Sequence, residues 1–226
     1  RVLHGAYSRG LAGNGVETIK GYAQFVDNQT VTVNGEQFQG THILIATGGR
    51  PCRLEVPGGE YAQNSDQFFE LTTLPKNPIV IGGGYIAAEI GGVMHGLGSN
   101  VSWAYRHERP LRNFDEMLSN HLVELYQQDG IQMYAQFIPA SIEKVGETYT
   151  VHFENGENLT GDYVFFAGGR TPNVDNIGLE KTDVDLSPEG VVVVDKFQNT
   201  MAPGIYAVGD VIGKIDLTPV AIAAGR

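Results

Sequence analysis

Apolar and polar positions alternate along the first part of the chain in the two-residue period of β-strands. This period predicts strands at residues 16–26 and 29–33. Residues 42–49 (HILIATGG) are apolar without alternation and end in two glycines, which is typical of a buried strand in a parallel sheet. Residues 50–77 contain several prolines and glycines, and this composition predicts a connector with a short helix at residues 65–71.

The middle of the chain changes to a longer period. Residues 77–106 have the order strand, glycine turn, helix, glycine stop and strand, which is a βαβ unit. Apolar residues at helical spacing in residues 114–130 predict a second, amphipathic helix. Residues 140–170 predict strands joined by two glycine turns, and residues 190–211 predict two more strands. These elements predict an α/β fold with a parallel sheet, helices and an antiparallel β-meander.

Two strand ends in distant parts of the chain are similar to each other. Residues 43–51 (ILIATGGRP) and residues 163–172 (YVFFAGGRTP) each consist of an apolar strand, a glycine pair, an arginine and a proline. We interpret them as equivalent crossings between two nucleotide-binding domains. A chance likeness between two strand ends is the alternative.

The turn after the first strand of the βαβ unit has the glycine pattern of dinucleotide-binding proteins. Gly82-x-Gly84-x-x-Ala87 follows a strand of β-branched residues and opens a helix. The first glycine of this pattern allows a tight turn, and the second lets the backbone approach a pyrophosphate. Ala87 and Gly91 let the helix lie close to the sheet, and its N-terminus then faces the phosphates. The pattern predicts a Rossmann-like dinucleotide-binding domain; a tight turn without a ligand is the alternative.

Arginines stand where the second strand of this unit ends. NAD-binding proteins have an Asp or Glu about 20 residues after the glycines, where it binds the ribose 2′-hydroxyl. This chain has Arg106 at that place and Arg112 shortly after it, and guanidinium groups suit the extra phosphate of NADP. His107 would add a donor, whereas the neighbours of Arg109 make it the weaker candidate. A solvated basic patch is the alternative.

Charge and composition argue against several classes of partner. The formal net charge of -11 and the pI near 4.9 argue against nucleic acid and an anionic membrane surface. No apolar run approaches the roughly 20 residues that a membrane-spanning helix needs. Cys52 is the only cysteine, which excludes an intrachain disulfide and favours a reducing, cytoplasmic setting, and no metal site is predicted. The chain lacks an initiator Met and stops within an apolar, helix-like pattern, so we expect a longer protein.

Six motifs along the chain resemble those of the flavin-dependent pyridine-nucleotide disulfide reductases. In chain order they are ATGGRP, GGGYIAAE, YRHERPLRNFD, GGRTPN, GIYAVGD and LTPVAIAAGR. The likeness extends over essentially all 226 residues. It implies NADP(H) and FAD as cofactors. It also implies an NADP-binding domain at residues 76–195, inserted between two parts of a FAD-binding domain at residues 1–75 and 196–226.

The resemblance assigns roles at the NADP(H) site. The glycines would line the pyrophosphate, Tyr85 would be a lid over the flavin, and Glu89 would face the nicotinamide as an auxiliary residue. Arg106 and Arg112 would clasp the 2′-phosphate, and the backbone of Asp216 would meet the nicotinamide amide. The full set implied for NADP(H) is Gly82, Gly83, Gly84, Tyr85, Ile86, Glu89, Arg106, His107, Arg112, Gly169 and Asp216.

The resemblance also assigns residues to the FAD site. Ala23 would approach the adenine half, and Thr47 and Gly48 end a strand near the dinucleotide. Asp210 would accept a hydrogen bond from a ribitol hydroxyl, a task that suits a carboxylate. Thr218 would offer its backbone N–H to the pyrimidine edge of the flavin, where the helix dipole stabilises negative charge on the reduced ring.

The activity implied is a relay: hydride passes from NADPH to FAD, and electrons then pass to a cysteine pair that reduces a disulfide. The chain has neither a Cys-x4-Cys pair nor the family's C-terminal region with its catalytic His, so we expect no turnover from this chain alone. The arginines point to the branch that reduces oxidised glutathione, rather than to the NAD-using dihydrolipoamide dehydrogenases. The resemblance also implies that the full-length protein is a homodimer through its C-terminal domain. Mercuric and large thioredoxin reductases, and a non-catalytic NADP-binding module, are the alternatives.

Overall fold

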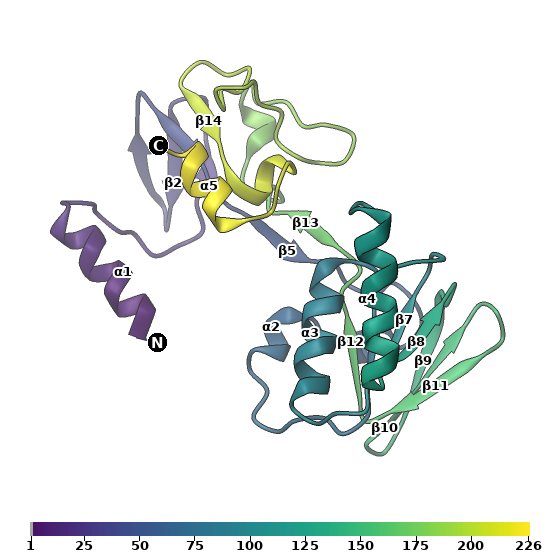
Figure 1. The fold of residues 1–226 in the computed structure, drawn as a ribbon. Helices are drawn as coiled ribbons and strands as arrows, with labels where there is room; N and C mark the ends of the chain where they lie inside the picture. The colour runs from purple at the N-terminus through teal and green to yellow at the C-terminus, as the bar shows by residue number, and fades with distance from the viewer. Residues whose placement is uncertain (1) are drawn as a thin grey trace. The chain divides into compact units, whose positions relative to one another are not determined.

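The computed structural model describes residues 2–226 and places them in two compact units (Figure 1). Unit 2 is one continuous segment, residues 50–171. Unit 1 comprises the chain up to Gly49 together with residues 172–226. Each unit buries hydrophobic clusters of its own, as independent domains do.

A four-stranded parallel sheet forms the centre of unit 2. Its strands are β6 (Pro78–Ile81), β7 (Ser102–Tyr105), β8 (Gln132–Ala135) and β12 (Tyr163–Phe166). They lie in the order β12-β6-β7-β8, and all three neighbouring pairs are parallel. Every residue of β6 is buried, as expected for a strand that is covered on both faces. The carboxyl ends of all four strands therefore meet at one edge of the sheet.

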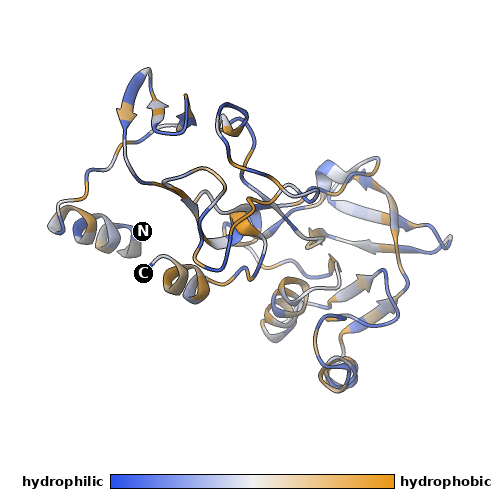
Figure 2. Cartoon of the chain, turned by 90° about the horizontal axis from the view of Figure 1, so that it is seen from above, coloured by the Kyte–Doolittle hydropathy of each residue, from blue (hydrophilic) through white to orange (hydrophobic). Residues whose placement is uncertain are grey.

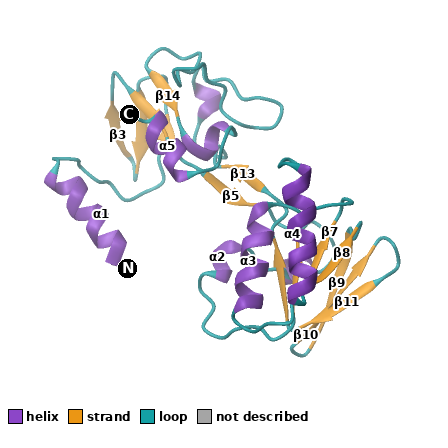
Figure 3. Ribbon diagram, viewed as in Figure 1, coloured by secondary structure: helices purple, strands orange, loops and turns teal. Residues whose placement is uncertain are grey.

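Two helices, α3 (Tyr85–Gly96) and α4 (Glu116–Asp129), cover one face of this sheet (Figure 3). The buried residues of α3 form one core cluster with Val80, Trp103 and Phe165 of the strands, and the half-buried Leu122 and Tyr126 of α4 pack against it. This arrangement confirms the βαβ unit and the amphipathic helix that the sequence predicts.

Capping residues define where the helices of unit 2 begin and end. At the start of α4, the Asp115 side chain accepts a backbone N–H of the first turn at 2.9 Å. Gly130 ends this helix in the left-handed conformation, with a φ of 105°. The short helix α2 (Ser65–Phe68) begins with a capping box formed by Asn64 and Gln67, and it confirms the helix predicted in the connector.

An antiparallel meander covers the other face of the sheet. Its strands are β9 (Pro139–Val145), β10 (Thr148–Phe153) and β11 (Asn158–Gly161). Ile142, Val151 and Phe153 pack against Ile79 and Val164. Because successive side chains of a strand point to opposite faces, these two sheet residues face the meander while their neighbours face the helices. The predicted α/β class with a β-meander is confirmed.

The connector after residue 49 belongs to unit 2. Gln63 lies along the edge of the parallel sheet, where its N–H donates to Val164 O at 2.8 Å and its carbonyl accepts the Phe166 N–H at 2.7 Å. The same segment contains the 3₁₀ helix η1 (Gly59–Tyr61). These contacts explain why the units divide at Gly49 and Arg50, earlier than the boundary after residue 75 that the sequence predicts.

Unit 1 contains two small sheets. The antiparallel one has the order β1-β2-β3, and β4 and β14 form a parallel pair. Two α-helices and two 3₁₀ turns complete the unit together with these strands. The elements are α1 (Val2–Gly13), β1 (Gln24–Phe25), β2 (Thr30–Val33), β3 (Glu36–Gln39), β4 (Ile43–Ile45), η2 (Leu179–Lys181), β14 (Ile205–Ala207), η3 (Gly209–Ile212) and α5 (Thr218–Ala224).

Residues 172–195 pack in the core of unit 1, although the sequence analysis places them in the NADP-binding domain. Ile177, Leu179, Val184 and Val192 are all buried in the cluster of that unit. The second division between the units therefore lies at Thr171 and Pro172.

The strand predicted at residues 16–26 is wrong for most of its length. Only Gln24 and Phe25 form a strand, and Val16 and Ile19 are exposed. These apolar residues have strand-like alternation but no neighbouring strand with which to form a ladder. The helix α1, which precedes them, was not predicted from the sequence.

Only one of the two strands predicted at residues 190–211 forms, namely β14. Val192 makes an isolated bridge with Leu186, and its N–H donates to Val211 O at 3.0 Å. It is 1% exposed. Its apolar pattern therefore reflects burial in the core rather than membership of a sheet.

The chain crosses between the units at the two similar segments that the sequence contains. The strands β5 (Gly49–Pro51) and β13 (Arg170–Pro172) lie at these crossings and pair with each other. Among the described residues, no helix combines the length and apolar character that crossing a membrane requires. Figure 2 shows hydrophilic residues interrupting the hydrophobic ones along the chain.

Candidate functional site

The glycine turn connects β6 to α3. Gly82 has a φ of 144°, and an added Cβ would lie 2.4 Å from Ala167 O, so no other residue fits there without displacing the backbone. Its N–H donates to Ala104 O at 3.0 Å, and its carbonyl accepts the Trp103 indole N–H at 2.6 Å. A Cβ added to Gly84 would meet nothing within 4 Å. The turn is thus held rigidly on the sheet side and is open at Gly84.

The helix α3 starts at this opening. Its first intrahelical bond runs from the Ala88 N–H to Gly84 O, so the N–H groups of the first turn have no acceptor within the helix. Ala87 is fully buried, and a Cβ on Gly91 would make an ordinary contact with Val101 at 3.8 Å, so the helix packs on the sheet but would also accommodate an alanine at Gly91. Open space, backbone donors and the positive end of the helix dipole together fit a pyrophosphate.

The arginine loop, residues 106–112, follows β7. The Arg106 and Arg112 side chains are exposed, and Arg106 Nε donates to His107 Nε2 at 3.1 Å. The pKa of His107 is lowered, first by desolvation and then by the positive charges of Arg112 and Arg106. Cationic groups therefore gather at this strand end, and the imidazole accepts a hydrogen bond in its neutral form.

Arg109 has a different environment from the other two arginines. Its Nη2 lies 3.9 Å from Glu116 Oε2, in the first turn of α4. This ion pair agrees with the expectation that Arg109 is the weaker candidate for phosphate binding.

The backbone of the arginine loop is fixed at two points. The Leu111 N–H donates to Gly83 O at 2.7 Å, so the loop is hydrogen-bonded directly to the glycine turn. The Ser119 hydroxyl donates to Pro110 O at 2.5 Å. Sequence reasoning missed Ser119, although it lies on the same face of α4 as the half-buried Leu122 and so had a signal in the helical period.

Gly169 stands at the same edge of the sheet as the glycine turn and the arginine loop. It follows β12, whereas Gly82 and Arg106 follow the parallel strands β6 and β7. Its φ is 131°, and its carbonyl accepts the Cys52 N–H at 3.0 Å. The order of the strands reverses between β12 and β6, and such switch points are where open α/β sheets bind ligands.

The remaining residues predicted for NADP(H) lie on two units. Tyr85 is the first residue of α3 and is 37% exposed, Ile86 is half-buried, and Glu89 is exposed one turn further along the same helix. Asp216 lies in unit 1, shortly before α5. The roles of these four residues stay predictions.

The strand ends predicted for FAD lie together in unit 1. Because β4 and β14 are parallel, Thr47 and Gly48 emerge at the same edge as Asp210, which lies in η3. The side chain of Asn173, which the sequence analysis missed, donates to Thr47 O at 3.0 Å, and its backbone N–H donates to Gly48 O at 2.9 Å. Thr218 begins α5 and is exposed.

Ala23, the last residue predicted for FAD, is exposed and directly precedes β1. The structure places it next to the antiparallel sheet of unit 1, whereas the other predicted FAD residues follow the parallel pair or begin α5. All five FAD assignments stay predictions.

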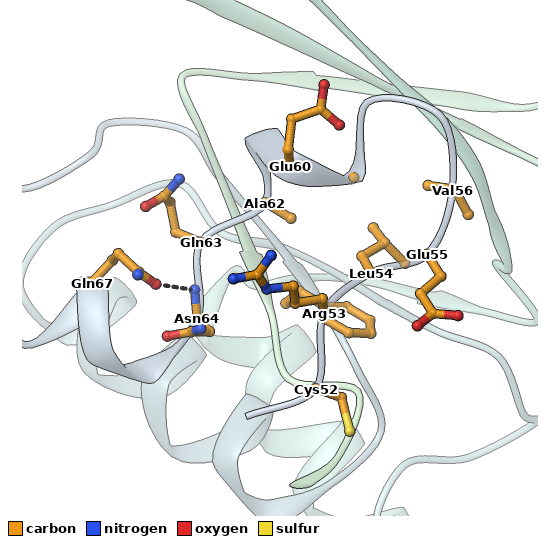
Figure 4. A pocket seen from close by; sticks show the side chains of 12 residues that line it. Cys52, Arg53, Leu54, Glu55, Val56, Glu60, Ala62, Gln63, Asn64 and Gln67 are labelled. Atoms are coloured by element: carbon orange, nitrogen blue, oxygen red, sulfur yellow. Dashed lines mark hydrogen bonds between the residues drawn. The ribbon is translucent and has the colours of Figure 1, made fainter. Parts of the chain in front are cut away.

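Unit 2 also contains a cavity of about 400 Å³, which is separate from the predicted cofactor residues. It is lined by residues of the segment 52–67 and by Phe166, and none of the predicted cofactor residues lines it. Figure 4 shows the sulfur of Cys52 pointing away from the Arg53 guanidinium. The Cys52 thiol lies 3.1 Å from the Thr171 hydroxyl. Across the part of the chain that the structure describes, no three His, Cys, Asp or Glu residues come together as a metal site.

The chain is similar to part of longer, curated proteins. A glutathione reductase from Nostoc sp. (strain PCC 7120) is 42% identical over 224 residues, which cover 94% of this chain and 49% of the relative. A glutathione reductase from Schizosaccharomyces pombe is 38% identical over 234 residues, which cover 99% of this chain and 50% of the relative. The chain thus spans about half the length of the curated relatives it matches.

A solved structure has the same fold. The Cu(II) complex of the HOCl-induced flavoprotein disulfide reductase RclA from Escherichia coli superposes with a TM-score of 0.93 at 25% sequence identity. The match covers 99% of this chain and 52% of that one. The family model described as pyridine nucleotide-disulphide oxidoreductase matches residues 3–225. The chain belongs to the pyridine nucleotide-disulphide oxidoreductase family.

Proposed function

We propose that this chain is the NADPH-binding part of a flavin-dependent disulfide reductase whose substrate is oxidised glutathione. Unit 2 binds NADPH, and unit 1 supplies part of the FAD site. Two relatives, 42% and 38% identical to the chain, are glutathione reductases, which supports the choice of substrate. The complete protein acts as a homodimer in the cytoplasm.

The observation that supports NADPH most directly is the arginine loop beside the glycine turn. A pyrophosphate at the N-terminus of α3 brings the adenosine ribose towards the end of β7. In NAD-binding proteins a carboxylate at that place accepts the 2′-hydroxyl, and it would repel a phosphate. Here Arg106 and Arg112 offer two forked, permanently charged groups, which match a phosphate in charge and geometry.

The residues of the chain bind and orient both cofactors in this proposal. When bound, NADPH would supply a hydride and FAD would carry its two electrons on to a disulfide. The α3 N-terminus stabilises the pyrophosphate, and Gly84 leaves room for it. Tyr85 and Glu89 lie on the same face of α3, four residues apart, and orient the nicotinamide. Asp210 holds the ribitol chain at the end of β14.

The test is calorimetric binding of NADPH and NADH to the chain. The unchanged chain should prefer NADPH. Arg106→Glu should reduce that preference by about tenfold to a hundredfold, the size expected for a lost charge-assisted hydrogen bond to phosphate. Arg53→Glu makes the same change of charge in unit 2 at a residue that lines the cavity and is not among the predicted cofactor residues, and it should leave the preference unchanged. Equal binding of NADPH and NADH by the unchanged chain would disprove the proposed cofactor.

The substrate is tested on the complete protein. Steady-state oxidation of NADPH should be fastest with oxidised glutathione and slower with oxidised thioredoxin, lipoamide or mercuric ion. A faster rate with one of these would assign the protein to another branch of the family and leave the cofactor proposal intact.

A further inference from the structure

Ser119 is a buried polar residue in the first turn of α4. Its side chain is fully shielded from solvent, and its hydroxyl donates to Pro110 O at 2.5 Å. Its backbone N–H already donates to Asp115 O at 3.1 Å within the helix. A buried hydroxyl that donates its hydrogen bond to a loop carbonyl, rather than to a carbonyl of its own helix, fixes that loop to the helix.

The bond acts on one peptide group of the arginine loop. The carbonyl of Pro110 and the N–H of Leu111 are the two ends of the same peptide unit. Ser119 binds the carbonyl end, and Gly83 O in the glycine turn accepts the N–H at 2.7 Å. Both ends of this planar group are held, so its orientation is set between α4 and the glycine turn.

The orientation of this peptide decides where Arg112 lies. Leu111 has a φ of 51°, a left-handed conformation that a leucine adopts only when its surroundings enforce it. Arg112 is the next residue, and its side chain is exposed, so no packing of its own fixes its position. The backbone that leads into Arg112 is therefore the part of the structure that positions it.

We propose that Ser119 is a positioning residue for cofactor selection: through the Pro110–Leu111 peptide it holds Arg112 in reach of the NADPH 2′-phosphate. This inference rests on the proposed NADPH site. Ser119 touches neither cofactor nor substrate in it. Because NADH has no 2′-phosphate, loss of the Ser119 hydroxyl affects the binding of NADPH and leaves that of NADH nearly unchanged.

The chain contains a matched control for this hydroxyl. Ser99 is 2% exposed, and its hydroxyl donates to the carbonyl of another proline, Pro75, at 2.6 Å. Both substitutions, Ser119→Ala and Ser99→Ala, leave a proline carbonyl in unit 2 without its hydroxyl donor. Ser99 lies between α3 and β7, outside the arginine loop, so its loss should lower stability without changing the choice of cofactor.

The experiment compares calorimetric affinities for NADPH and NADH across these variants of the chain. Ser119→Ala should lower the ratio of NADPH to NADH affinity by about fivefold to tenfold, as expected for one broken buried hydrogen bond. Ser99→Ala should leave the ratio unchanged. If Ser119→Ala keeps the ratio, or if Ser99→Ala lowers it equally, Ser119 has only a structural role and the inference is wrong.

A double-mutant cycle tests whether Ser119 acts through Arg112. In an Arg112→Ala background, Ser119→Ala should change the ratio by less than twofold, because the group it positions is already absent. An undiminished effect in that background overturns the inference. If Ser119→Ala does not fold, Ser119→Cys keeps the volume with a weaker donor and should lower the ratio in the same direction.

The unchanged chain separates this inference from the proposed function. If the chain shows no preference for NADPH, the proposed cofactor is wrong, and the role of Ser119 falls with it. If the chain prefers NADPH and Arg106→Glu removes the preference while Ser119→Ala does not, the proposed function stands and the inference alone is refuted.

Discussion

His107 lies between the two arginines that we assign to the phosphate. It accepts a hydrogen bond from Arg106 Nε at 3.1 Å, which requires an unprotonated Nε2. Desolvation, Arg112 and Arg106, in that order, lower its pKa below the ordinary 6.5. At neutral pH the positive charge of this strand end therefore comes from the arginines alone, and His107 serves as a neutral acceptor or donor.

The state of His107 should report on the phosphate. A dianion bound between the arginines cancels their charge, so NADPH should raise the pKa of His107, and NADH should raise it less. Proton NMR titration of the imidazole, with and without each cofactor, measures this shift. Arg112→Ala should also raise the pKa of His107 in the free chain. If NADPH and NADH shift the pKa equally, the phosphate lies elsewhere.

The same pKa shift gives a direction for the pH dependence of stability. Because the pKa of His107 is lower in the folded chain than in the unfolded one, protonation favours unfolding. Its contribution to stability is present above the ordinary value of 6.5 and is lost as the pH falls from there through the lowered pKa. Arg112→Ala should weaken this part of the pH dependence.

At the scale of elements, the two glycines of the glycine turn have different roles, one in the fold and the other in cofactor binding. Gly82 is required by the backbone, since its φ is 144° and a Cβ would strike Ala167 O. Gly84 has an extended backbone, with a φ of -94°, and open space around it. The first glycine is therefore structural, and the second leaves space that a pyrophosphate fills.

Substitution of each glycine by alanine should separate these two roles. Gly82→Ala should lower the free energy of unfolding by about 1–3 kcal/mol, the usual range for backbone strain of this kind. Gly84→Ala should change it by less than about 1 kcal/mol, yet weaken NADPH and NADH equally, because both have the pyrophosphate. Urea unfolding and calorimetry measure the two effects. Unchanged binding by Gly84→Ala would mean that the pyrophosphate does not lie at this turn.

The elements that the sequence predicts well are those whose pattern and packing agree. The glycine fingerprint, β6, α3 and β7 follow from strong local signals, and each is buried as the pattern indicates. Residues 16–23 show the opposite case: their apolar residues alternate as in a strand, but no neighbouring strand is present among the described residues to pair with them, so no strand forms. Ser119 was missed because the helical period indicates that it is buried, but not which loop carbonyl its hydroxyl binds.

At the scale of the whole chain, unit 2 is one continuous segment whose two hydrophobic clusters consist of its own residues. It contains the glycine turn, the arginine loop and Gly169, together with the strands and helices that hold them. Unit 1, by contrast, is assembled from two separate segments.

Residues 50–171, expressed alone, should therefore fold and bind NADPH in preference to NADH. Circular dichroism during heating should show one cooperative transition, and calorimetry should give an NADPH affinity within about tenfold of the longer chain's. The corresponding segment cut at the boundaries predicted from sequence, residues 76–195, lacks Gln63 at the sheet edge and should be less stable. If the two segments are equally stable, the connector does not support the sheet.

The boundaries at residues 75 and 195 come from the family resemblance, whereas the division into two compact units at residues 50 and 171 reflects long-range contacts. Gln63 reaches the sheet through hydrogen bonds to residues about a hundred positions later in the chain, at Val164 and Phe166. Local composition contains no information on such pairing. The glycine turn and the arginine loop were easier to locate in the sequence, since each follows a strand with its own strong pattern.

The pairing of β5 with β13 has a consequence for how such a chain is built. The strands at which the chain enters and leaves unit 2 are paired with each other. In the sequence of unit 1, the whole of unit 2 is therefore equivalent to one long surface loop with its two ends close together. The entropy cost of closing a loop rises only with the logarithm of its length. A complete nucleotide-binding domain can thus be inserted, exchanged for another or circularly permuted at this ribbon while the host domain keeps its fold.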